Sequence, residues 1–159
     1  KVIQPLFLDD LRAEFARLNA RKDSSRRNAL EAFHTKLSRM KFFDPACGCG
    51  NFLIIAYREL RDLEIELLRE LNPRGQTTFL DVSLLSRIDV NQFYGIEISE
   101  FPARIAEVAL WMMDHIMNNK LSLEFGDHYV SRDNLDGTSA TIRMVICSRD
   151  GLMITAAGG

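Results

Sequence analysis

The residues best suited to chemistry lie in one glycine-rich stretch. Its sequence is Asp44-Pro45-Ala46-Cys47-Gly48-Cys49-Gly50-Asn51-Phe52. A short apolar run precedes it and a helical pattern follows it, so we expect a sharp turn from a strand into a helix. Such a turn presents backbone N–H groups and the positive end of the helix to a ligand. Gly48 and Gly50 remove side chains so that a polar ligand can approach the main chain, and Asp44 can accept a hydrogen bond from an ammonium or hydroxyl group.

Two common phosphate-binding patterns do not fit this stretch. A dinucleotide site requires a third Gly or Ala three residues after the second glycine, and an acidic residue about 20 residues further on. Here the third position is Leu53, and the acidic residue that ends the next strand, Glu97, lies more than twice that far from Gly50. The Gly-Lys-Ser/Thr of a phosphate-binding P-loop does not occur in the sequence.

S-adenosylmethionine matches the stretch better than a dinucleotide does. Its amino-acid tail carries a carboxylate and an ammonium group, which suit the glycine turn and Asp44. Its ribose diol needs a carboxylate at the tip of the neighbouring strand, where Glu97 stands, and Ile98 beside it would pack against the adenine. The same residues also allow a purely structural interpretation, in which Gly48 and Gly50 only permit a tight turn.

Two segments of the chain resemble motifs of a known family. Residues 44–53 are very similar to the cofactor-binding motif of methyltransferases that modify exocyclic amino groups, most often adenine in DNA. Residues 93–98 and 100–106 look like the adenosine-binding strand and the next helix in one branch, the large single-chain restriction–modification enzymes. That branch fuses an endonuclease, a methyltransferase and a DNA-recognition domain. The resemblance covers about residues 1–125, and Cys49 stands where the family commonly has Ser.

This resemblance implies a fold and a cofactor site. The fold would be a partial, truncated Rossmann-like fold of the S-adenosylmethionine-dependent methyltransferases. Asp44, Ala46, Gly48 and Gly50 would surround the methionine tail of the cofactor, and Glu97 would hold its ribose. The complete set of expected cofactor-binding residues is Asp44, Pro45, Ala46, Cys47, Gly48, Gly50, Asn51, Phe52, Glu97 and Ile98.

The motif that positions the methyl acceptor in this family does not occur in the sequence. In the family, a short Asn/Asp-Pro-Pro-aromatic turn holds the amino group and stacks on the flipped base. The four prolines are Pro5, Pro45, Pro73 and Pro102, and no two are adjacent. We therefore expect the cofactor-binding half of a DNA adenine methyltransferase, with no catalytic residue of its own and no activity alone. A methyltransferase acting on RNA or on a protein glutamine, and an inactive truncated gene product, remain alternatives.

The composition indicates one soluble domain with little affinity of its own for DNA. Its 159 residues include 20 Lys and Arg against 22 Asp and Glu. A domain that holds DNA alone is usually basic, so we expect other parts of a parent protein to supply that contact. The odd cysteine count and the lack of a signal peptide or membrane-spanning run favour a cytoplasmic protein. Cys47, Cys49 and Cys147, with three scattered histidines, do not predict a metal site.

The order of expected elements gives the fold class. Helical periodicity predicts helices over residues 5–19, 51–71 and 100–118, and a further helix that begins after Ser24 or Ser25 as N-cap and ends at about residue 40. Strands are expected over residues 41–44, 92–98 and 141–147. The last of these strands is expected to form a hairpin with residues 152–155. Strands alternating with helices are typical of an α/β protein with a parallel sheet. Residues 1–40 would form N-terminal helices that pack on the core, and residues 41–159 the cofactor-binding half.

The helical patterns also predict which faces are buried. In the third helix the expected buried residues are Leu53, Ala56, Tyr57, Leu60 and Leu67, and the expected solvent-facing residues are Glu59, Arg61, Asp62 and Glu66. In the fourth helix Ile105, Val108, Ala109, Met112 and Ile116 share one face, and Trp111 is assigned to the core or to an interface.

The strand that carries Phe42 and Phe43 is central in the family's fold. On one of its sides the family has the strand that leads into the acceptor-positioning turn. Without that strand, an edge of unpaired N–H and C=O groups would be exposed, and such an edge can pair with another copy. We therefore expect self-association through the sheet edge, unless residues 141–155 fold back as a substitute.

Overall fold

The computed structural model describes residues 4–72, 85–125, 144–147 and 153–155. Its elements in chain order are η1 (Gln4–Leu8, a π-helical turn), α1 (Asp9–Asn19), α2 (Arg26–Arg39), β1 (Phe42–Asp44), α3 (Asn51–Leu71), η3 (Val90–Gln92, a 3₁₀ turn), β2 (Phe93–Glu97), α4 (Glu100–Phe125), β3 (Met144–Cys147) and β4 (Met153–Thr155). The expected α/β class is confirmed. α4 continues beyond the expected end at residue 118 to Phe125.

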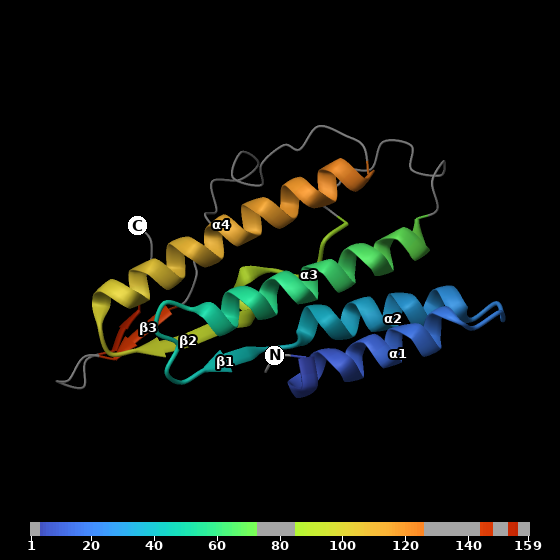
Figure 1. Ribbon diagram of the computed structural model, residues 1–159. Coiled ribbons are helices and arrows are strands. Elements are labelled where there is room, and N and C mark those ends of the chain that lie inside the picture. Colours follow the sequence, from blue (N-terminus) through green and yellow to red (C-terminus); the bar gives the residue numbers. More distant parts are fainter. Residues whose placement is uncertain (1–3, 73–84, 126–143, 148–152, 156–159) are drawn as a thin grey trace.

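The strands form one mixed sheet in the order β1-β2-β3-β4. β1, β2 and β3 are parallel, and β4 returns antiparallel to β3 as the predicted hairpin. Figure 1 shows α3 and α4 running side by side over the sheet, while α1 and α2 extend the helical layer beyond β1. The carboxyl ends of β1 and β2 therefore lie at the same edge, where the two expected motifs meet.

Aromatic rings join the sheet to the helical layer. The ring of Phe42 stacks on that of Phe93 on the neighbouring strand, with centroids 4.9 Å apart. Tyr57 of α3 meets the Phe93 ring edge-on at 5.3 Å. All three side chains are buried, so this cluster fixes α3 across the β1–β2 pair. The five residues predicted for the buried face of α3 are all buried.

The prediction that Arg61 faces solvent is wrong. Arg61 and Glu64 are both buried in α3 and form an ion pair with Nη1 and Oε2 2.9 Å apart. Arg61 also donates to the side chain of Asn118 in α4. Helical periodicity assigns a charged residue to the solvent face, but α3 is covered on several sides, so charge pairing replaces solvent there.

Glu64 is the centre of this buried polar network. Its carboxylate accepts hydrogen bonds from His34 of α2 (2.7 Å), from the Ser86 hydroxyl (2.8 Å), and from the backbone N–H groups of Arg87 (2.7 Å) and Ile88 (3.1 Å). Burial acts to raise the pKa of Glu64, but the hydrogen bond from His34 and the charge of Arg61 outweigh it, so the pKa is lowered. One carboxylate thus connects two helices to the segment that leads into β2.

The predicted buried face of α4 is wrong. The residues that pack inward are Ala103, Ala106, Leu110, Met117 and Leu121. The face expected to be buried, with Ile105, Val108, Met112 and Ile116, is exposed. Both faces of α4 are apolar, so periodicity does not distinguish them. The face with small alanines is the one that fits closely against the glycine turn.

The serine cap expected for α2 does not form. Ser25 stands at the N-cap position, but its side chain caps no backbone group of the helix. Instead its hydroxyl donates to the Asp23 carboxylate at 2.7 Å, and Arg21 binds the same carboxylate. The hydrogen bond from Ser25 and the charge-assisted bond from Arg21 lower the pKa of Asp23. The Ser25 oxygen, which a cap would use as the acceptor, accepts instead from the Arg21 guanidinium at 2.7 Å.

Candidate cofactor site

The glycine turn after β1 folds as a compact loop held by its own main chain. The Ala46 N–H donates to the Asp44 carboxylate at 3.1 Å, and the Gly50 N–H donates to the Cys47 carbonyl at 2.8 Å. The Cys47 N–H donates to the carbonyl of Ile96 in β2 at 3.0 Å. The turn is therefore attached to the end of β2 as well as to its own strand.

The two glycines have different roles, which the sequence did not separate. Gly50 has φ of 79°, and a Cβ placed on it would lie 2.8 Å from the Cβ of Ala106 in α4. Its missing side chain thus serves helix packing, and the expectation that Gly50 clears space for a ligand does not describe this position. Gly48 has φ of 53°, and a Cβ there would meet nothing within 4 Å. Gly48 is the position that faces open space.

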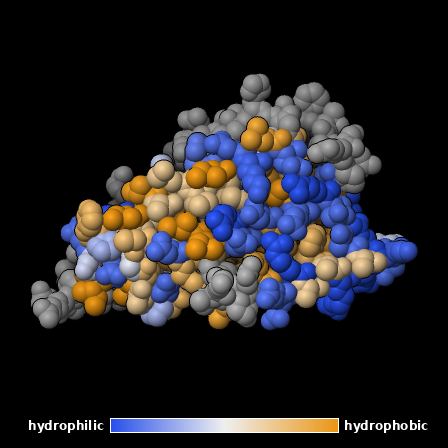
Figure 2. Space-filling view, viewed as in Figure 1, coloured by the Kyte–Doolittle hydropathy of each residue, from blue (hydrophilic) through white to orange (hydrophobic). Residues whose placement is uncertain are grey.

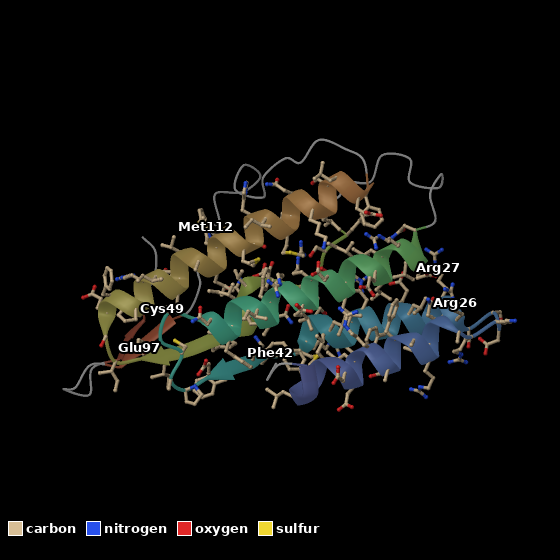
Figure 3. The ribbon with its side chains drawn as sticks, viewed as in Figure 1. Arg26, Arg27, Phe42, Cys49, Glu97 and Met112 are labelled. Carbon is tan, nitrogen blue, oxygen red and sulfur yellow. The ribbon has the colours of Figure 1, made fainter. Side chains whose placement is uncertain are left out.

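Glu97 connects the two predicted motifs. One carboxylate oxygen accepts from the Gly48 N–H at 3.0 Å, and the other accepts from the Ser99 N–H at 2.9 Å. Figure 3 shows Glu97 beside Cys49 at the end of the sheet. Residues 49 positions apart in the chain are thus joined directly. A carboxylate has about four acceptor sites, so two remain for further hydroxyl donors.

The start of α3 offers donors to an anion. Gly50 precedes the helix in the left-handed conformation, and no side chain caps the first turn. The unpaired N–H groups of a helix start and its positive dipole end favour a carboxylate. Asn51 is exposed at this point and Phe52 is half-buried.

The expected adenine contact lies at the surface. Ile98 directly follows Glu97, and this residue is 69% exposed. Pro45 and Ala46 are exposed on the glycine turn. The structure thus brings residues 44–52 and residues 97–98 together at one end of the sheet, as the sequence predicted.

The two cysteines of the turn differ in environment. Cys47 is buried, and burial raises the pKa of its thiol, with the nearby carboxylates of Asp44 and Glu97 adding to the effect. Cys49 is exposed. A raised pKa disfavours the thiolate that metal binding and nucleophilic attack require, so it does not indicate either role for Cys47. The side chain of Cys147 lies outside the described residues.

Gln92 is a positioning residue that sequence reasoning did not identify. Its buried Nε2 donates to the carbonyls of Leu37 (2.8 Å) and Met40 (2.9 Å), which precede β1. Its Oε1 accepts from the Asp89 N–H at 2.8 Å. Gln92 therefore sets the start of β2 against the start of β1, with Phe42 opposite Phe93. Only the Asp89-x-x-Gln92 capping box could have indicated it from sequence.

Residues 18–133 match the family described as MmeI, DNA-methyltransferase domain. The chain belongs to this family. Among curated proteins it is 44% identical, over 124 residues, to the DNA methyltransferase A of Bacillus subtilis (strain 168). This match covers 78% of the chain and 13% of that protein. It is 28% identical over 91 residues to a putative type II restriction enzyme and methyltransferase of Methanocaldococcus jannaschii. That match covers 57% of the chain and 7% of the relative.

A solved structure supports the same assignment to the MmeI methyltransferase family. The type IIL restriction–modification enzyme MmeI, determined in complex with DNA, superposes with a TM-score of 0.79 and 53% sequence identity. The match covers 92% of this chain and 18% of MmeI. The chain therefore spans less than a fifth of each of these relatives. Within the described residues, no helix is both long and apolar enough to cross a membrane.

Proposed function

We propose that this chain is the S-adenosylmethionine-binding part of a DNA adenine methyltransferase. The observation that carries the proposal is the junction of Glu97 with the glycine turn, where its carboxylate lies 3.0 Å from the Gly48 N–H beside open space. Membership of the MmeI methyltransferase family supports it. Residues 1–40 are assigned to the helices that pack on the core, and residues 41–159 to the cofactor-binding half.

The residues around the junction suit the parts of this cofactor. The uncapped start of α3 would hold its carboxylate, and Asp44 its ammonium group. Glu97 would accept from the two ribose hydroxyls, for which its remaining acceptor sites are sufficient. The exposed side chain of Ile98 would cover the adenine. When bound, S-adenosylmethionine supplies an electrophilic methyl carbon, and this chain's part is to hold and orient it.

The acceptor side of the reaction belongs to residues outside this sequence. An adenine amino group must be held and aimed at the methyl carbon, and no Pro-Pro-aromatic turn is present to do this. The net charge of −2 also differs from the basic balance that is usual for a domain that holds DNA by itself. DNA would therefore be bound and its base flipped by other parts of a longer protein.

A calorimetric titration with S-adenosylmethionine tests this proposal through two matched carboxylate variants. Glu97→Ala removes the junction, and losing a charge-assisted hydrogen bond of about 1.5–3 kcal/mol should weaken cofactor binding at least tenfold. Glu100→Ala removes an exposed carboxylate three residues away that forms an ion pair with Arg104 of the same helix, and binding should not change. Equal affinity of Glu97→Ala and the unmodified chain would place the cofactor elsewhere.

A further inference from the structure

α4 carries a second apolar face that the cofactor site does not use. Its exposed residues are Phe101, Ile105, Val108, Trp111, Met112 and Ile116, and we call this set the outer face of α4. Figure 3 shows Met112 on the side of α4 away from the sheet. Figure 2 shows that apolar residues gather over the end of the molecule that holds the sheet and the start of α4. A helix that is apolar on both faces is typical of one that is covered on both sides.

The outer face has the size of a protein interface. Phe101 is 76% exposed, Met112 60% and Val108 58%. Taken together, the exposed parts of its six side chains present on the order of 600 Å², the upper end of the largest apolar patch on a typical monomer. Two such faces in contact would bury about 1,200 Å², where stable interfaces begin.

The spacing along the outer face suits another helix. Phe101, Ile105, Val108 and Met112 follow one another at intervals of four, three and four residues, which keeps them on one stripe. The same stripe on a second α4, running antiparallel, would provide matching ridges. Antiparallel helices also place opposite dipole ends together.

The charged side chains beside the stripe do not indicate a charged partner. Arg104 is paired within its own helix, with Glu107 at 3.1 Å and with Glu100 at 3.8 Å. A membrane-surface helix would instead border its apolar face with several Lys and Arg residues. The outer face thus fits a neutral protein surface of its own kind.

We propose that the outer face of α4 is an interface between two copies of this chain, with the two α4 helices antiparallel about a two-fold axis. The sheet edge is the weaker route to association, because β1 has only three residues and short edge strands pair poorly. In a contact about a two-fold axis, the same patch lies on both sides of the interface. Each exposed side chain of the outer face would therefore be covered in both copies. The proposal does not depend on cofactor binding.

The test uses two substitutions at side chains of equal exposure. Val108 on α4 and Phe43 on β1 are each 58% exposed, so replacing either by Lys should leave the fold intact. Sedimentation equilibrium should give the unmodified chain a mass of twice 18.1 kDa, about 36 kDa. Val108→Lys should raise the dimer dissociation constant at least tenfold, and Phe43→Lys should leave it unchanged. Circular dichroism of each variant verifies folding.

The single tryptophan gives an independent readout. Trp111 lies on the outer face and is the only Trp of the chain, so its emission should shift to the blue as the concentration rises and the dimer forms. A monomer at all concentrations, a dimer that only Phe43→Lys dissociates, or a dimer whose Trp111 emission stays constant would each overturn the proposal.

Discussion

At the scale of single residues, the two glycines of the turn, Gly48 and Gly50, have different surroundings. Both glycines of the turn were predicted to clear space for a ligand. In the structure the space beside Gly48 is open, whereas Gly50 packs against Ala106. Sequence could identify the turn, because two glycines after a strand are a local signal. It could not separate them, because the difference depends on a helix more than fifty residues away.

This distinction predicts losses of stability of different size for two similar substitutions. Gly50→Ala places a Cβ 2.8 Å from Ala106 at a positive φ and should cost about 2–4 kcal/mol of stability. Gly48→Ala meets only the backbone penalty of about 1 kcal/mol. Thermal unfolding of both variants measures the difference. Equal losses would show that the contact with Ala106 is not the constraint on Gly50.

Gly48 should matter for binding more than for folding. A branched side chain at Gly48 would enter the open space where the methionine tail is proposed to lie. Gly48→Val should therefore abolish measurable S-adenosylmethionine binding while the protein stays folded. A titration of this variant measures the effect, and unchanged affinity would mean that the space beside Gly48 is not part of the site.

At the scale of elements, the sequence predicted which helices and strands form better than it predicted which of their residues are buried. The alternation of strands and helices follows from local periodicity, and β1, α3 and β2 lie where it placed them. The apolar face that periodicity grouped on α4 is exposed, and Arg61, which was assigned to solvent, is buried. Both errors concern helices whose surroundings come from distant segments, which local periodicity does not contain.

The buried network around Glu64 predicts a large cost for one substitution. Glu64→Gln would leave Arg61 buried without its ion-pair partner, which should cost about 3–5 kcal/mol. Glu66→Gln is the matched control, because Glu66 is half exposed and pairs with Arg12 at the surface, where a pair contributes about 0–1 kcal/mol. Urea unfolding compares the two. A similar small loss of stability in both variants would contradict the proposed contribution of the network to the free energy of unfolding.

The same network predicts a pH dependence of stability. Because the pKa of Glu64 is lowered by folding, its stabilising contribution is complete above the unfolded value of about 4.3. As the pH falls below that value, the unfolded chain takes up the proton first, and the contribution is lost by the time the pH passes the folded pKa. Unfolding free energies of the chain and of Glu64→Gln should therefore converge toward low pH. A constant difference between them would contradict the lowered pKa.

At the scale of the whole molecule, the proposed function gives this chain one side of a reaction. It has the proposed cofactor site but no adjacent prolines to hold a target base. The chain alone should therefore transfer no labelled methyl group from S-adenosylmethionine to unmethylated DNA. Incorporation above a control without protein would show that the acceptor is positioned by residues of this chain after all.

The most direct test of the central claim is to locate the cofactor on the ¹⁵N-labelled chain by amide chemical shifts. On addition of S-adenosylmethionine, the amides of Gly48, Asn51, Glu97 and Ile98 should shift together, and NAD should shift none of them. That result would follow from the junction between the glycine turn and Glu97. Shifts confined to other parts of the chain, or none at millimolar cofactor, would contradict the account.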